Sequence, residues 1–132
     1  MLVKLFPRSL HAILDYMAAL LLLVAPWLFH FDHARPAMLL SILFGVVILG
    51  MSLLTNYEGG IRKTIPMDIH LYADIFGGGF LALSPWLLFF SETTYLFHLS
   101  MGLGLVFSGL LTKRESQQIH MPKPGDRHIQ NG

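Results

Sequence analysis

Residues 9–31 read SLHAILDYMAALLLLVAPWLFHF, and residues 68–90 read DIHLYADIFGGGFLALSPWLLFF. The two stretches place a histidine, an aspartate and a Pro-Trp pair at the same relative positions, 59 residues apart. Leucines that match would mean little in an apolar chain, but His, Asp, Pro and Trp at a constant offset indicate an internal repeat. Each stretch is also long enough for a transmembrane helix, which needs about 20 largely apolar residues.

The same offset aligns the chain with itself without a gap from about residue 4 to residue 53. The further matches are Lys4 with Lys63, Pro7 with Pro66, Ser41 with Ser100, Gly45 with Gly104, and Gly50 with Gly109. A two-helix unit returns the chain to its starting side, so the copies are predicted to be parallel and related by a pseudo-two-fold axis along the membrane normal. We predict a first repeat at residues 1–60, a second at 61–112 and a flexible cytoplasmic tail at 113–132.

The composition indicates an integral membrane protein. The chain has 132 residues, 54% hydrophobic and 13% charged, whereas a soluble domain has about 25% charged residues. Predicted spans lie at residues 9–31, 36–54, 68–90 and 94–111, which gives an all-α fold, a four-helix transmembrane bundle. A net charge of +1 argues against a nucleic-acid partner, and the absence of cysteine excludes disulfides and thiol catalysis.

Basic residues predict the orientation in the inner (plasma) membrane. One side of the predicted bundle holds eight of them, and the other side holds only Arg35. The eight are Lys4, Arg8, Arg62, Lys63, Lys113, Arg114, Lys123 and Arg127. Both termini are therefore expected in the cytoplasm.

The Pro-Trp pairs carry a family resemblance. Ser84-Pro85-Trp86, and with one departure Ala25-Pro26-Trp27, resemble the motif of the SPW-repeat family of small membrane proteins, which lies in the first of two transmembrane helices per repeat. The resemblance covers most of the chain apart from its tail and implies fold and location, without an activity. Independently of it, Pro26, Trp27, Pro85 and Trp86 are expected near the outer interface, where tryptophan forms a belt and proline bends or ends a helix.

His11 and Asp15, and again His70 and Asp74, are spaced four residues apart, so each pair shares one face of its helix. Ionisable groups inside a membrane span are costly and indicate a functional site. Four readings stay open at this point: polar contacts between helices, which we rank first, a metal site for Zn²⁺, Mn²⁺ or iron, a proton relay, or a site for a polar or cationic small molecule.

Small residues predict where helices approach closely. Those next to the Asp residues, namely Ala18, Ala19, Gly77 and Gly78, are expected between the first and third helices. Two further stripes, Ser41 with Gly45 and Ser100 with Gly104 and Ser108, are expected on packing faces within the monomer or between protomers. On the outer side, where His98 is also expected, His30, His33 and Glu92 form a weak candidate for a surface metal site, although loop histidines there are more often unremarkable.

No motif for a nucleotide, a nucleophile or an HExxH zinc site occurs. The sequence therefore predicts a small membrane binding or assembly module, with a small oligomeric transporter or a proton- or metal-handling protein as the alternative, and an enzyme ranks last. Expected partners are the lipid bilayer and either a second copy or another membrane protein. No cofactor is named by the sequence, although a divalent metal fits the His–Asp groups.

Overall fold

The computed structural model describes residues 6–57 and 59–113, and in these residues the protein is all-α. Four helices follow one another: α1 (Arg8–Leu28), α2 (Arg35–Leu54), α3 (Met67–Leu87) and α4 (Leu96–Leu111). The described residues contain two isolated bridge pairs and no strand. Each predicted span overlaps one helix, with ends that differ by at most three residues. The predicted tail lies outside the described residues, apart from Lys113.

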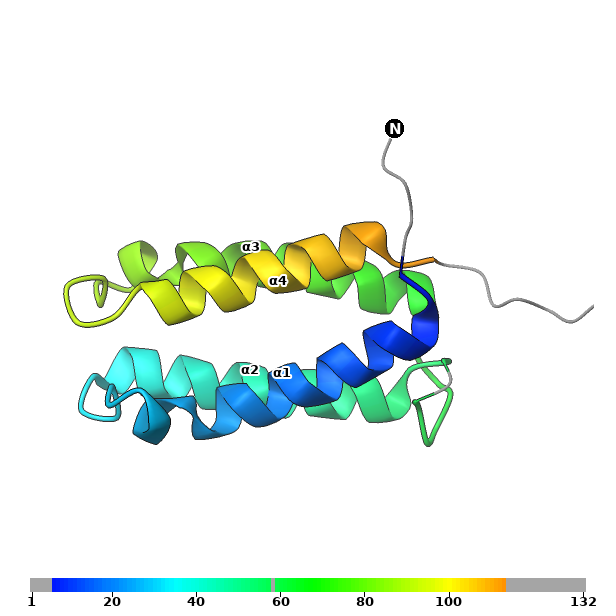
Figure 1. Cartoon of the computed structure of the whole chain (residues 1–132), viewed down its shortest axis with the longest axis horizontal. Helices are drawn as coiled ribbons and strands as arrows, with labels where there is room; N and C mark the ends of the chain where they lie inside the picture. The colour runs from blue at the N-terminus through cyan, green and yellow to red at the C-terminus, as the bar shows by residue number, and fades with distance from the viewer. Residues whose placement is uncertain (1–5, 58, 114–132) are drawn as a thin grey trace, which may run out of the picture.

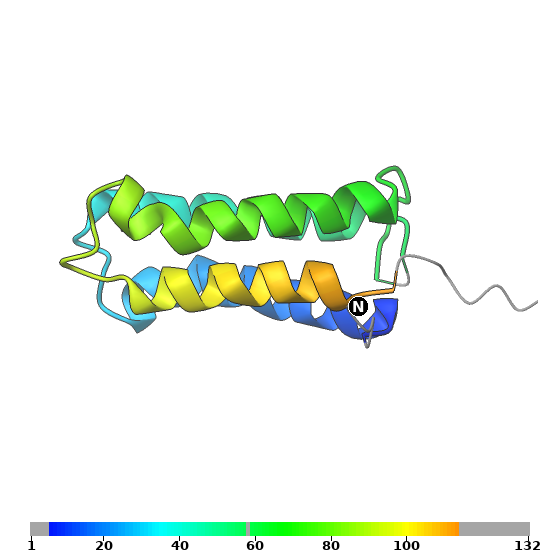
Figure 2. The same cartoon turned by 90° about the horizontal axis from the view of Figure 1, so that it is seen from above.

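The helices form two hairpins that lie against each other. α1 packs on α2, and α3 packs on α4. Figures 1 and 2 show one hairpin stacked on the other, with α4 beside α1 and α3 beside α2. α1 and α3 therefore lie diagonally across the bundle.

Two bridge pairs join the start of each hairpin to the end of the other. Phe6 pairs with Thr112, and Thr55 pairs with Ile65. Both pairs lie at the same end of the bundle, which we call the terminal end; the opposite end, with the α1–α2 and α3–α4 connections, is the loop end (Figure 1).

Small residues bring helices together within each hairpin, and not between α1 and α3 as the sequence predicted. A methyl group added at Gly45 would meet the Ala19 carbonyl oxygen at 3.1 Å, and one added at Gly102 would clash with the backbone of Gly78. The diagonal placement of α1 and α3 explains the difference, because diagonal helices meet only where side chains reach the bundle axis.

The other predicted packing residues have different surroundings. Ala18, Ser100 and Gly104 line a crevice between α1 and α4, and Gly104 has nothing within 4 Å of an added methyl group. A methyl group added at Gly77 would lie 3.6 Å from the Phe44 ring of α2. The stripe in α4 is thus only partly a packing face.

The equivalent positions of α2 and α4 are not separated by the 59 residues that the sequence alignment indicated. Gly45 and Gly102 make the equivalent close contacts, which is an offset of 57 residues rather than 59. Thr55 and Thr112, which follow α2 and α4, differ by the same 57. The chain from Gly78 to Gly102 is therefore two residues shorter than the equivalent path from Ala19 to Gly45.

Both prolines of the Pro-Trp pairs lie in the last turn of their helices. The N–H groups of Phe31 and Phe90 donate to the carbonyl oxygens of Pro26 and Pro85, each at 2.8 Å. The residues just before the two phenylalanines have left-handed backbones, with φ of 56° and 59°. This is the Schellman arrangement that ends a helix, so the motif terminates α1 and α3.

Each proline also leaves one carbonyl oxygen, four residues earlier, without its helical donor. In α3, Ser84 Oγ donates to the Leu81 carbonyl at 2.6 Å. In α1, where Ala25 replaces the motif serine, Ser41 Oγ from α2 donates to the Leu22 carbonyl at 2.8 Å. A serine therefore bonds a carbonyl at this point in both hairpins.

The core of the bundle is apolar from its middle to its loop end. Leu22, Ile48, Leu81 and Leu105 are buried in one cluster with contributions from all four helices. A smaller cluster at the terminal end includes Tyr57 and Leu71.

Much of the outer surface is apolar as well. Phe76 is 75% exposed and Leu20 is 64% exposed. By length and composition, α1 and α2 could each cross a membrane, and α4 is apolar but shorter. α3 does not meet the same criterion, since it carries Asp68, His70 and Asp74.

Candidate functional site

Four ionisable side chains meet on the bundle axis near the terminal end. His11 and Asp15 come from successive turns of α1, and His70 and Asp74 come from the matching turns of α3. All four are buried, with His11 fully excluded from solvent. The prediction that the two pairs converge between these helices is confirmed.

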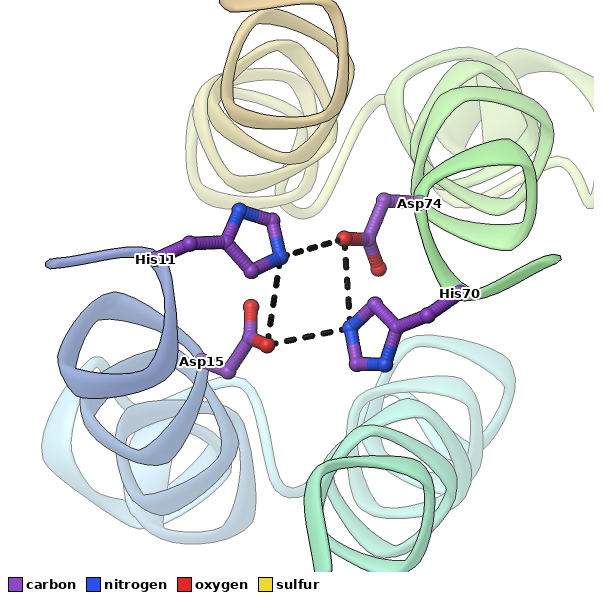
Figure 3. A group of neighbouring side chains, drawn as sticks. All are labelled: His11, Asp15, His70 and Asp74. Carbon is purple, nitrogen blue, oxygen red and sulfur yellow. Dashed lines mark ion pairs between the residues drawn. The ribbon is translucent and has the colours of Figure 1, made fainter. Parts of the chain in front are cut away.

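The four residues form a closed ring in which histidine and aspartate alternate (Figure 3). His11 Nε2 lies 3.3 Å from Asp15 Oδ2 and 3.0 Å from Asp74 Oδ2. His70 Nε2 lies 3.0 Å from Asp15 Oδ2 and 3.4 Å from Asp74 Oδ2. Each histidine is thus nearer to the aspartate of the other hairpin, so the ring joins the two hairpins.

A threonine fixes the tautomer of His70. Thr55 Oγ1 lies 2.6 Å from the Met51 carbonyl and 2.5 Å from His70 Nδ1. A hydroxyl has one proton to donate, and a carbonyl can only accept. Thr55 therefore donates to Met51 and accepts from His70, which places a proton on Nδ1.

His11 is held in the same way from α4. Thr112 Oγ1 donates to the Ser108 carbonyl at 2.6 Å and lies 2.9 Å from His11 Nδ1. Ser108 Oγ lies 2.8 Å from the same nitrogen. His11 Nδ1 therefore carries a proton too, and Ser108, predicted as a packing residue, contacts the ring.

With the proton on Nδ1, the other ring nitrogen, Nε2, faces the centre of the ring in both histidines (Figure 3). A neutral imidazole with a proton on Nδ1 has a lone pair on Nε2. Neither Nε2 makes a hydrogen bond, and Asp74 Oδ2 makes none either, although all three atoms are buried. Buried polar atoms without hydrogen-bond partners are costly, so a positive charge at the centre of the ring would stabilise it.

The two aspartates have different support. Asp15 Oδ2 accepts from Ser52 Oγ at 3.4 Å and from the Tyr57 hydroxyl at 3.3 Å. Burial raises the pKa of the Tyr57 phenol above its usual value, so Tyr57 keeps the proton that it donates. Asp74 Oδ2 has no such donor.

A crevice reaches each carboxylate from the side of the bundle. The crevice between α1 and α4 has a volume of about 580 Å³ and includes Asp15 in its wall. The one between α2 and α3 has about 230 Å³ and includes Asp74. Apart from these carboxylates and the hydroxyls of Ser100 and Ser108, their walls are apolar.

The predicted residues of the loop end are placed differently. Within residues 6–57 and 59–113, the ring is the one group of three or more candidate metal ligands, so His30, His33 and Glu92 do not form the second site that we considered. Trp27 and Trp86 are exposed, and their place in an outer membrane belt stays a prediction.

His98, expected on the outer side, is fully buried near the start of α4. Its Nε2 donates to the Ala37 carbonyl at 3.2 Å, and its ring contacts those of Phe31, Phe90 and Phe97.

Sequence reasoning missed the hydroxyl residues around the ring. Thr55 and Thr112 end the two second helices, but the 59-residue alignment does not pair them, and an offset of 57 would have done so. Ser52 and Tyr57 carry no repeated signal, so only the folded chain identifies them as partners of Asp15.

The comparison with known families agrees with this architecture. The model of the SPW repeat domain matches residues 9–112. The chain belongs to the SPW repeat family. In this SPW protein the match includes all four ring residues and both Pro-Trp pairs. No curated protein matches the chain, and no solved structure matches it.

Proposed function

We propose that this protein is a four-span inner-membrane protein of two tandem hairpin repeats, residues 1–60 and 61–112. In this proposal the His–Asp ring binds positive charge and thereby clamps the repeats into one assembly module. The observation that carries the proposal is the alternation of the ring, in which each histidine lies 3.0 Å from the aspartate of the other hairpin.

Electrostatics supports a bound cation. With neutral histidines, Asp15 and Asp74 give the ring two negative charges. Charges are costly to bury in a bilayer unless they are paired. Two protons or one divalent cation would make the ring neutral, and either would attract both hairpins.

The membrane location is supported by the surface. Large apolar side chains such as Phe76, Leu20 and Leu39 are more than half exposed, and lipid is the solvent in which such a surface is stable. In this proposal α3 also crosses the membrane, with His70 and Asp74 turned toward the bundle axis and away from lipid.

Transport is a second candidate, because the two lateral crevices reach Asp15 and Asp74. Against it, Leu22, Ile48, Leu81 and Leu105 form a packed cluster between the ring and the loop end. A path along the axis would require that cluster to open, so the clamp is the function that we favour.

Thermal unfolding in mild detergent tests the clamp. Asp15→Asn/Asp74→Asn keeps side-chain shape and removes the two ring charges, while Asp32→Asn/Asp68→Asn removes the same charge from exposed positions. We expect the ring variant to lose about 3–5 kcal/mol of stability, the typical cost of breaking a buried ion pair, and the control to change little. Equal unfolding temperatures for the two variants would refute the clamp.

A further inference from the structure

We propose that the cation in the ring is a divalent transition-metal ion of the Zn²⁺ class, bound by His11 Nε2, His70 Nε2, Asp15 Oδ2 and Asp74 Oδ2. This inference rests on the proposed function, because it names the cation that the clamp holds. It differs from the proposal above in excluding two protons as the bound charge.

The histidines are prepared as metal ligands. Thr55 and Thr112 accept from Nδ1 of His70 and His11, so the neutral rings present lone pairs at Nε2. Metal-bound histidines generally donate their other N–H to an oxygen, which fixes the tautomer and the ring orientation. Two hydroxyls from α2 and α4 perform that task here.

Protons fit the geometry less well than a metal does. An Nε2–H group would need a carboxylate oxygen along its bond direction. Both Nε2 atoms lie within ion-pair distance of carboxylate oxygens, at 3.0–3.4 Å, but neither has a carboxylate oxygen in hydrogen-bond geometry. Each nitrogen is directed between two carboxylates, which is where a metal ion shared by all four residues would lie (Figure 3).

The edges of the ring have the length expected between neighbouring ligands of one metal ion, whereas its diagonals are wider than those of a tetrahedron. Ligands about 2.0–2.1 Å from Zn²⁺ at tetrahedral corners lie about 3.3–3.4 Å from one another. Neighbouring atoms of the ring are 3.0–3.4 Å apart, and all four lie within 4.8 Å of one another. The separation of up to 4.8 Å belongs to a pair across the ring, so tetrahedral coordination requires opposite ligands to approach each other.

Charge and ligand type select the class of ion. Two carboxylates and one divalent cation give a neutral centre, which suits a buried site. Two imidazoles with two carboxylates suit Zn²⁺, Fe²⁺ or Mn²⁺. Mg²⁺ retains water and prefers oxygen ligands, and no thiolate is present to favour Cu⁺.

The experiment is a metal titration of the purified full chain in mild detergent after treatment with a chelator. Zn²⁺ is added, unbound ion is removed by gel filtration, and the bound metal is measured by elemental analysis, with Mg²⁺ as the comparison ion. Co²⁺ provides a second readout, because its visible absorption reports tetrahedral coordination. Asp74→Asn removes one ligand, and Asp68→Asn is the matched control at an exposed position of the same helix.

We expect about one Zn²⁺ per chain in the wild type and in Asp68→Asn, and binding at least tenfold weaker in Asp74→Asn. Thr55→Val/Thr112→Val keeps all four ligands and removes their outer support, so it should weaken Zn²⁺ binding by about 10–100-fold. If Asp74→Asn does not fold, the threonine double variant tests the metal site in its place. A wild type that retains no Zn²⁺, or Zn²⁺ binding that neither the Asp74→Asn nor the threonine variant weakens, would overturn the metal site.

The failure of this inference is distinguishable from failure of the clamp. If the wild type binds no Zn²⁺ but Asp15→Asn/Asp74→Asn still unfolds at a lower temperature than its control, the metal is refuted and the clamp stands. If Zn²⁺ binds at the ring but the two double variants unfold at the same temperature, the metal site stands and the clamp is refuted.

Discussion

At Leu22 and Leu81 the helical backbone has a carbonyl oxygen that a proline four residues later cannot bond. Ser84, the first residue of the Ser-Pro-Trp motif, donates to the Leu81 carbonyl from within α3. Ala25 stands at the matching place in α1, and Ser41 donates from α2 instead. The departure of the first repeat from the motif is thus compensated by a serine in the neighbouring helix.

This compensation predicts a rescue. Ser41→Ala should lower the free energy of unfolding by about 1–3 kcal/mol, because it leaves a buried carbonyl oxygen without a donor. Adding Ala25→Ser restores the motif and should recover at least half of the loss. Thermal unfolding in detergent measures both changes.

Ser100→Ala is the control for this pair, since Ser100 is exposed and its loss should change stability by no more than about 0.5 kcal/mol. If Ala25→Ser gives no recovery, the Leu22 carbonyl is not the reason for the serine at position 41.

At the scale of the helices, each hairpin closes through tight glycine contacts. Gly45 meets Ala19 in the first hairpin, and Gly102 meets Gly78 and Ala82 in the second. Close backbone approach of this kind is a main source of association between membrane helices, since lipid provides little hydrophobic drive.

Two neighbouring glycines of α4 test this description. Gly102→Ala should destabilise the bundle by about 1–3 kcal/mol, because the added methyl group overlaps backbone atoms that cannot move freely. Gly104→Ala should be neutral or slightly stabilising, since it meets open space and alanine favours the helix. The unfolding temperatures of the two single variants test this prediction. A lower unfolding temperature for Gly104→Ala than for Gly102→Ala would support the gapless 59-residue register.

The helices themselves were predictable from sequence because apolar length and flanking prolines bound them closely. The register of α4 was not. Small residues recur every few positions in α4. The sequence alignment therefore pairs Gly45 with Gly104, whereas in the structure Gly102 makes the contact equivalent to that of Gly45. Only the contact with Gly78 distinguishes Gly102 from Gly104, and that contact depends on the path of the chain between α3 and α4.

The ring was partly predictable for a related reason. The four-residue spacing places His11 beside Asp15 on one helix face, and the repeat duplicates the pair. The cross-pairing of His11 with Asp74 depends on the diagonal arrangement of α1 and α3, which no local pattern encodes. Tyr57 depends on the path of the α2–α3 connection, and it was missed for that reason.

For the molecule as a whole, the proposed topology predicts which residues can be labelled from outside. The chain lacks cysteine, so single cysteines can be introduced without background. Asp32→Cys and Glu92→Cys at the loop end should react with a membrane-impermeant maleimide in intact spheroplasts, and Lys63→Cys at the terminal end should react only after lysis. Labelling of Lys63→Cys in intact spheroplasts would contradict the orientation that the basic residues predict.

The central claim is that one shared ring, rather than two separate His–Asp pairs, joins the repeats. A double-mutant cycle on the free energy of unfolding tests it most directly, with Asp15→Asn, Asp74→Asn and the combined variant. A shared ring predicts that the two losses do not add, with a coupling energy of about 1–3 kcal/mol, as found for residues of one polar network. Losses that add to within about 0.5 kcal/mol would mean that each aspartate acts only within its own helix, and would contradict the account.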